Sequence, residues 1–188
     1  MHEESRQIAP RSSPLLPRHL LDWVALMERL TPDDRPGLVA HFRALDLDDR
    51  RRRFGVPVDD DFLARYVDGL DFGRDVVFGV CSGPGEWLGA GHLVLGGPTA
   101  ELGLSVHAEA RGRGLGGAIF RFAVAHAARA GVGRLYMHCL TTNRAIMAIA
   151  RSAGMSIESD GGESDAYLVV PPYAEFARML MREAEPVA

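Results

Sequence analysis

Arg111-Gly112-Arg113-Gly114-Leu115-Gly116 connects a predicted strand over residues 101–106 to a long helical pattern over residues 114–130. Glycines let a backbone bend sharply and approach a ligand closely, and the first N–H groups of a helix have no partner within the helix. The helix dipole adds positive potential at the same end. The stretch therefore predicts an anion site for a diphosphate or a similar group.

Three kinds of phosphate-binding loop share such glycines, and spacing separates them. A P-loop has Lys and then Ser or Thr directly after its last glycine, whereas Gly117-Ala118 follows Gly116 here. A dinucleotide-binding loop has the pattern Gly-x-Gly-x-x-Gly and an acidic residue about 20 positions later, and the chain has neither. What remains is Arg-x-x-Gly-x-Gly, preceded by the strand residues Leu104-Ser105-Val106.

The segments after the loop extend this pattern. A strand is predicted over residues 134–139, and Asn143 then opens a helix that Gly154 ends as a C-cap. The order of loop, helix, strand and Asn-capped helix, with the last turn Arg151-Ser152-Ala153-Gly154-Met155, resembles the GNAT family of N-acetyltransferases. The matched elements cover residues 100–155.

The resemblance implies an α/β protein with the acyl-CoA N-acyltransferase fold, in which helices flank a splayed mixed sheet of six to seven strands. Where two strands splay, unpaired N–H groups bind the pantetheine arm of acetyl-CoA, and the glycine loop binds its pyrophosphate. Acetyl-CoA (coenzyme A) is therefore the implied cofactor. The positions that match its binding residues are Leu104, Ser105, Val106, Arg111, Gly112, Arg113, Gly114, Leu115, Gly116, Gly117 and Asn143. Asn143 is equally natural as a plain N-cap.

The implied reaction is direct attack of an amine on the thioester. It requires a base, because an unperturbed lysine has a pKa of about 10.4. Glu101 is the candidate base, since it lies in an otherwise apolar strand and shares one face with Gly103 and Ser105. Bacterial protein lysine acetyltransferases of the family, the subgroup that the motifs resemble most, have a glutamate at a similar position. The alternative is a solvent-facing glutamate on a sheet edge.

The general acid is where the chain departs from the family. Many members have a tyrosine four residues before the glycine of the last turn, and this chain has Ala150. Tyr136, His138 and Ser105 are substitutes, or the thiolate leaves unaided, which a thiol pKa near 8.5 permits.

The run Arg50-Arg51-Arg52-Arg53 has two interpretations. Aspartates flank it on both sides, which favours a helical face with ion pairs over a nucleic-acid patch. A similar segment recurs in one acetyltransferase subgroup, and this resemblance implies that Arg53 and Phe54 line the acceptor pocket.

Composition favours one domain over residues 20–188, preceded by a mobile leader over residues 1–19 that is rich in Pro and Ser. No run of 18 apolar residues and no signal-peptide profile is present, so we expect a cytoplasmic protein without a membrane partner. The net charge of -4 argues against nucleic acid. Cys81, Cys139 and the seven histidines lack metal-ligand spacing, so no metal is expected. Dimerisation is common in the family, so a homodimer is one possible assembly of this chain.

The remaining elements are predicted from apolar periodicity and from capping residues. We expect strands over residues 24–30, 76–81, 87–95 and 166–170, helices over 33–45, 46–53, 59–69 and 173–183, and a tight loop over 160–164.

Two functions remain open. The first is acetyl-CoA-dependent N-acetylation of a primary amine, either a protein lysine or a small molecule. The second is a sensor or regulator that binds acyl-CoA without turnover. The sequence does not fix the acceptor, and transfer of a longer acyl group is a further alternative.

Overall fold

The computed structural model describes residues 20–184, so the predicted leader over residues 1–19 lies outside the described range. In chain order the helices and strands are α1 (Leu20–Ala25), β1 (Glu28–Arg29), the 3-10 helix η1 (Pro32–Asp34), α2 (Arg35–Ala44), α3 (Leu47–Phe54), α4 (Asp60–Asp68), β2 (Val76–Gly83), β3 (Glu86–Gly96), β4 (Thr99–Val106), the 3-10 helix η2 (Ala108–Ala110), α5 (Leu115–Arg129), β5 (Arg134–Leu140), α6 (Arg144–Ser152), β6 (Ser156–Asp160), β7 (Glu163–Val169) and α7 (Tyr173–Ala184).

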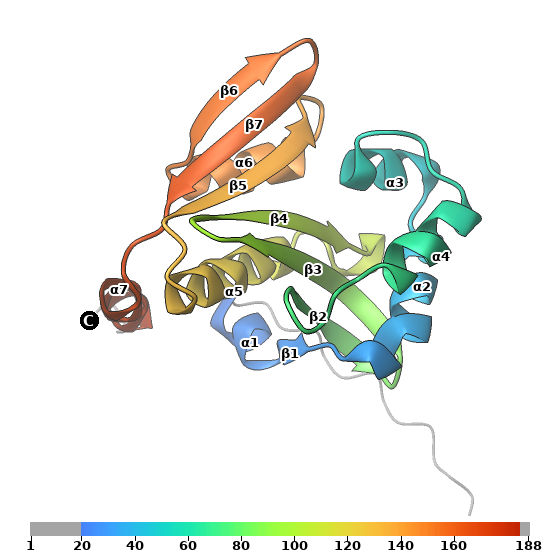
Figure 1. Cartoon of the computed structure of the whole chain (residues 1–188), viewed down its shortest axis with the longest axis horizontal. Coiled ribbons are helices and arrows are strands. Elements are labelled where there is room, and N and C mark those ends of the chain that lie inside the picture. The colour runs from blue at the N-terminus through green and yellow to red at the C-terminus, as the bar shows by residue number, and fades with distance from the viewer. Residues whose placement is uncertain (1–19, 185–188) are drawn as a thin grey trace, which may run out of the picture.

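The strands form one seven-stranded sheet in the order β1-β2-β3-β4-β5-β7-β6 (Figure 1). Neighbouring strands are antiparallel except for β4 and β5, which are parallel. A mixed sheet with helices around it confirms the predicted fold class.

The strands β4 and β5 pair only at one end. Their register joins Thr99, Ala100 and Glu101 to Arg134, Leu135 and Tyr136, and no further residues pair. Beyond this point β4 pairs only with β3, and β5 pairs only with β7. The sheet therefore opens into a wedge between β4 and β5, as the family resemblance predicts.

Two apolar cores fix the helices on opposite faces of strands β2 to β4. On one face, α1 and α5 pack through residues such as Trp23 and Ile119 (Figure 1). On the other face, α2 and α4 pack through Leu38 and Leu63. Because both faces are covered, the residues of β4 are held firmly, which positions the wedge beside the start of α5.

Local capping explains why the short acidic segments form helices. The side chain of Asp46 accepts a hydrogen bond from the Asp49 N–H and begins α3, and Asp59 accepts one from the Phe62 N–H and begins α4. Gly55 ends α3 with a φ of 79°. The predicted helices over residues 46–53 and 59–69 are confirmed within one residue of these bounds.

The strand predicted over residues 24–30 is mostly wrong. The chain is helical in α1 as far as Ala25, and only Glu28 and Arg29 pair with β2. Trp23 is fully buried against α5, and its indole N–H donates to the carbonyl oxygen of Arg113 at 2.7 Å. This tertiary anchor outweighs the strand preference of the apolar run.

The end of the sheet also differs from the prediction. The strand predicted over residues 166–170 begins earlier, at Glu163, and β6 precedes it as the other arm of a hairpin. The loop predicted over residues 160–164 is shorter in the structure and consists of Gly161 and Gly162, whose φ values are 55° and 97°. Two consecutive glycines with positive φ suit a tight hairpin turn.

Candidate active site

The glycine-rich loop ends in a sharp turn at the start of α5. Gly112 and Gly114 have φ values of 71° and 86°, which a residue with a side chain rarely adopts. A Cβ on Gly116 would lie 3.2 Å from the side chain of Ile149 on α6, so a glycine there lets the two helices approach. The predicted anion loop thus has free N–H groups at a helix N-terminus, next to the wedge.

The backbone of β4 presents polar groups to the wedge. The His107 N–H donates to the carbonyl of Leu88 on β3 at 2.8 Å. Because successive residues of a strand point their N–H groups to opposite edges, those of Leu104 and Val106 point away from β3. They face the wedge, where β5 no longer pairs with β4. The Ser105 N–H points to β3 instead.

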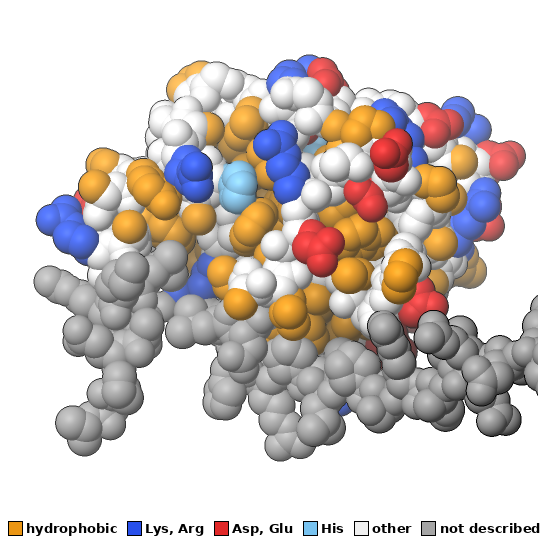
Figure 2. All heavy atoms as spheres, turned by 90° about the horizontal axis from the view of Figure 1, so that it is seen from below, with side chains coloured by type: hydrophobic (Ala, Val, Ile, Leu, Met, Phe, Trp, Pro, Cys, Tyr) orange, Lys and Arg blue, Asp and Glu red, His pale blue; other side chains and the backbone are white. Residues whose placement is uncertain are grey.

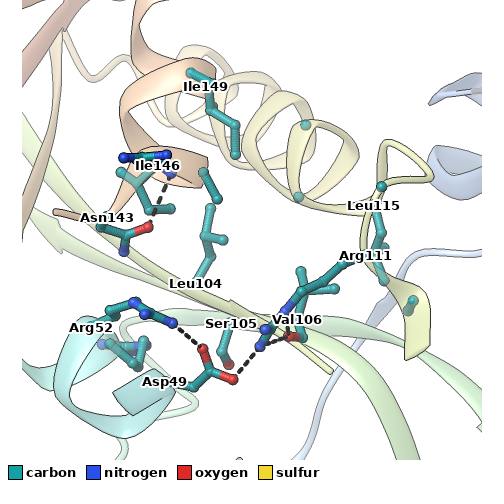
Figure 3. A pocket seen from close by; sticks show the side chains of 18 of the residues that line it. Asp49, Arg52, Leu104, Ser105, Val106, Arg111, Leu115, Asn143, Ile146 and Ile149 are labelled. Atoms are coloured by element: carbon teal, nitrogen blue, oxygen red, sulfur yellow. Dashed lines mark hydrogen bonds and ion pairs between the residues drawn. The ribbon is translucent and has the colours of Figure 1, made fainter. Parts of the chain in front are cut away.

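A cavity of about 670 Å³ joins the loop to the wedge. Figure 3 shows Leu104, Ser105 and Val106 on its strand side, with residues of α6 across from them. Asn143 lines it and also caps α6, because its Oδ1 accepts from the Ile146 N–H at 3.2 Å. The structure thus brings nearly all the predicted cofactor residues to one cavity. Those lining it are Leu104, Ser105, Val106, Arg111, Gly112, Gly114, Leu115, Gly116, Gly117 and Asn143.

The two loop arginines differ. Arg111 donates from Nε and Nη2 to the carbonyl of Val106 at 3.0 and 2.9 Å and forms an ion pair with Asp49 of α3 (Figure 3). Asp49 also pairs with Arg52 at 2.9 Å. Arg113 is exposed, forms no ion pair with any described residue and does not line the cavity. Sequence reasoning missed Asp49, which places a carboxylate in a cavity suited to anions.

Glu101 lies where the wedge begins. It is the last residue of β4 paired with β5, opposite Tyr136, and its side chain is exposed. Alternation along β4 places Gly103 and Ser105 on the same face, as predicted. Glu101 itself does not line the cavity, and the pairing of β4 with β5 ends at its position.

The candidate acids are engaged with other groups. The Tyr136 hydroxyl donates to Asp165 at 3.0 Å, and the Nδ1 of His138 lies 2.7 Å from the same carboxylate. Burial, and then the hydrogen bond to Asp165, raise the pKa of Tyr136. The hydrogen bond from His138 lowers the pKa of Asp165. Ala150 is fully buried on α6 and offers no donor. Asp165 had no sequence signal of its own.

Ser105 forms an unexpected pair with His41 of α2. Burial lowers the pKa of His41 to about 3, so its imidazole is neutral at pH 7. Its Nδ1 lies 2.7 Å from the Trp87 carbonyl, which can only accept, so Nδ1 carries the proton. Its Nε2 therefore accepts from the Ser105 hydroxyl at 2.8 Å. Ser105 directs its proton to His41 and not to the wedge.

Arg53 and Phe54 lie at the C-terminal end of α3. The guanidinium of Arg53 lies over Gly103 of β4 and lines the cavity, while its Nη2 donates to the Tyr66 hydroxyl at 2.8 Å. Phe54 packs edge-on against Phe42 and Tyr66. The adjacent arginines Arg50 and Arg52 form ion pairs with aspartates, as expected for that run.

The described residues lack two kinds of feature. They contain no cluster of three or more metal-ligating side chains, and none of their helices is long and apolar enough to cross a membrane. Acidic, basic and apolar side chains are interspersed on the described part of the face in Figure 2, without a continuous basic surface there.

The fold, the wedge and the glycine loop define an acyl-CoA N-acyltransferase. The chain matches the family model described as "Acetyltransferase (GNAT) domain" over residues 25–156, and it belongs to that family. The predicted family is thereby confirmed: the chain is an acetyltransferase, and its cofactor is acetyl-CoA. No curated protein sequence matches it significantly.

Several solved structures share the fold. The GNAT domain of S. lividans PAT has a TM-score of 0.66 at 20% identity, over 76% of this chain and 89% of that one. Spermidine N-acetyltransferase from Vibrio cholerae, in complex with CoA and spermine, has a TM-score of 0.62 at 14% identity, over 79% and 96%. Ribosomal-protein-alanine N-acetyltransferase from Brucella melitensis has a TM-score of 0.57 at 18% identity, over 77% and 99%. At these identities the likeness concerns the fold alone.

Proposed function

We propose that the protein transfers the acetyl group of acetyl-CoA to a primary amine by direct attack on the thioester. The observation that carries this proposal is the wedge between β4 and β5, which opens beside the glycine loop within one cavity. A cytoplasmic location and a homodimer stay predictions within it.

The loop and the wedge suit the two ends of the cofactor. The N–H groups at the start of α5 would bind the pyrophosphate, with Arg111 and Arg113 adding positive charge. The N–H groups of Leu104 and Val106 would bind the pantetheine arm and polarise the acetyl carbonyl. Asn143 would contact the cofactor from α6.

Glu101 is the proposed base. It would take a proton from the acceptor ammonium, through a water, so that the neutral amine can attack the acetyl carbon. The N–H of Val106 would stabilise the oxyanion that forms. The C–S bond would then break, and the proton left on the attacking nitrogen would pass to solvent as the amide forms. Because Tyr136, His138 and Ser105 direct their polar atoms to other residues, we propose that the thiolate leaves unaided.

Calorimetric titration with acetyl-CoA tests the cofactor assignment, with NADP and ATP as controls. Selective binding of acetyl-CoA is expected. Thiol release in the presence of an amine panel then tests transfer. Binding without thiol release from any amine would contradict the transferase and would support the acyl-CoA sensor. Preference for a nucleotide would overturn the loop assignment.

A further inference from the structure

Arg53 carries a positive charge with no negative partner within residues 20–184. Its side chain is half-buried, and it forms no ion pair with any described residue. The guanidinium carbon lies 4.9 Å from the ring centroid of Phe54, 5.6 Å from that of Tyr66 and 5.9 Å from that of Phe42. Three aromatic rings thus hold the cation in place where a carboxylate would ordinarily do so.

Two neighbouring arginines of α3 do have carboxylate partners, unlike Arg53. Arg50 pairs with Asp60 at 2.8 Å, and Arg52 pairs with Asp49 at 2.9 Å. Partly buried charges are usually paired, because removal from water disfavours an isolated ion. Arg51 and Arg53 have no ion pair among the described residues, but Arg51 is exposed to solvent, whereas Arg53 is half-buried and reaches the sheet.

Gly103 makes room for this guanidinium. A Cβ at that position would lie 2.5 to 2.6 Å from its central carbon and its two terminal nitrogens. The guanidinium therefore lies against β4 between the positions of Glu101 and Ser105, within the lining of the cavity. Residues two apart on a strand are about 7 Å apart, so Arg53 lies between the candidate base Glu101 and the strand residues that line the cavity.

Glu101 is a nearby carboxylate on the same face of β4, and among the described residues no ion pair joins it to Arg53. The positive charge of Arg53 contributes, after burial, to the lowered pKa of both His41 and His92. Its remaining N–H groups have no hydrogen-bond partner among the described residues, since the bond from Nη2 to Tyr66 is its only one there. A guanidinium presents paired N–H groups that fit a carboxylate.

We propose that the acceptor is a small amine that also carries a carboxylate, as a free amino acid does, and that Arg53 binds this carboxylate. The inference rests on the proposed acetyltransferase function and specifies its acceptor. The carboxylate anchors the substrate against β4 and directs its amine toward the thioester in the wedge. A polyamine would place a second ammonium near Arg53 and is disfavoured.

The test uses the full chain, acetyl-CoA and thiol release, with matched pairs of acceptors. Free amino acids are compared with their carboxamides, and β-alanine with propylamine. We expect kcat/KM to be about 10- to 100-fold higher for the carboxylate member, the range for a hydrogen bond to a charged group. Amidation lowers the pKa of the amine, so without recognition the amide would be the faster member of its pair.

Variants assign the effect to Arg53. Arg53→Gln should raise KM about 10- to 100-fold for the carboxylate acceptors, with little change for the amides. Arg51→Gln is the matched control. Arg51 is an exposed arginine of the same helix, so this substitution removes the same charge without removing Arg53. Gly103→Ala keeps the charge but displaces the guanidinium, and should show the same selective loss. Arg53→Lys should keep part of the preference for carboxylate acceptors, and this variant replaces Arg53→Gln as the test if Arg53→Gln is unstable.

The inference alone would be overturned by amides that react faster than their amino acids together with equal rates for β-alanine and propylamine, or by acetylation of a lysine peptide or spermidine more efficiently than any amino acid. An Arg53→Gln loss shared equally by both members of each pair would do the same. Thiol release from no amine, with acetyl-CoA bound, would overturn the proposed function and this inference together.

Discussion

The cofactor side and the acceptor side of the site are built by different means. The cofactor side consists of β4 backbone, the glycine loop and the start of α5, within residues 104–117, with Asn143 added from α6. The proposed acceptor side consists of Arg53 and Glu101, side chains from two separate elements, near the hydrogen-bonded pair of Tyr136 and Asp165. The first side depends on backbone conformation and the second on tertiary packing. Mutations should therefore affect the two sides in different ways.

Glu101→Gln is expected to give the largest difference between the effect on turnover and the effect on acetyl-CoA affinity. Loss of a general base lowers rates by about 10²- to 10⁴-fold, so kcat should fall by that range. Affinity for acetyl-CoA should stay the same, because Glu101 lies outside the cavity that holds the cofactor residues. Steady-state thiol release and calorimetry measure the two quantities.

Glu175→Gln is the control, since Glu175 is an exposed glutamate on α7. Equal kcat values for the Glu101 variant and the unchanged protein would remove Glu101 from the mechanism.

The converse separation is expected from Gly114→Val. Its φ of 86° is unfavourable for a residue with a side chain by about 1–2 kcal/mol, and a β-branched residue is the least tolerant. The loop should shift, and affinity for acetyl-CoA should fall by about 10- to 100-fold in a calorimetric titration.

Gly97→Val provides the matched strain, because Gly97 has a φ of 71° in the turn between β3 and β4. This variant should lose a similar amount of folding free energy but keep its affinity for acetyl-CoA. If both variants lose affinity alike, the effect belongs to folding and not to the loop.

The same contrast explains what the sequence revealed. Gly112, Gly114 and Gly116 lie in one short segment: the first two have a positive φ that favours glycine, and the third lets α6 approach α5 closely. The family resemblance then predicted the wedge, which the structure shows as an interrupted pairing after Glu101. Local chemistry of this kind is legible without a structure.

The partners of the polar side chains around the site were not legible, because these contacts join distant segments. His41 and Ser105 are 64 positions apart, and Tyr136 and Asp165 are 29 apart. Nothing in α2 marks His41 as the partner of Ser105. The strand wrongly predicted over residues 24–30 fails for the same reason, since the bond from Trp23 to Arg113 spans 90 positions.

The buried His41 makes stability depend on pH. The pKa of His41 is about 3 in the folded protein, mainly through burial, against 6.5 in the unfolded chain. Between these values only the unfolded chain binds the proton, so the stabilisation present above pH 6.5 is lost as pH falls, by about 1.4 kcal/mol per unit. Burial lowers the pKa of His92 and His126 as well, which adds to the slope.

Urea unfolding between pH 7 and pH 5 measures this slope. His41→Gln can still donate to the Trp87 carbonyl and accept from Ser105, so it should fold and show a slope about 1.4 kcal/mol per unit smaller. An unchanged slope would mean that His41 is not the source.

The smallest expected effect concerns α3, the element that joins the two sides. Asp49 of α3 holds Arg111 and Arg52 in the cavity, while Arg53 of the same helix lies over Gly103. Asp49→Asn removes a negative charge close to the proposed pyrophosphate position and releases both arginines. Acetyl-CoA affinity should rise about three- to tenfold at low salt, and the gain should shrink as salt screens the charges.

Asp48→Asn is the matched control for this last effect. Asp48 is largely exposed, with a side chain 81% accessible, and its ion pair with Arg52 is longer, at 3.8 Å. Its removal should leave affinity nearly unchanged, because an exposed pair contributes little. If Asp49→Asn weakens binding instead, then Asp49 orients Arg111 for the pyrophosphate. In that case α3, a helix of the proposed acceptor side, positions a charge that binds the cofactor. The two sides would then be separate in their backbone elements but linked by the ion pair between Asp49 and Arg111.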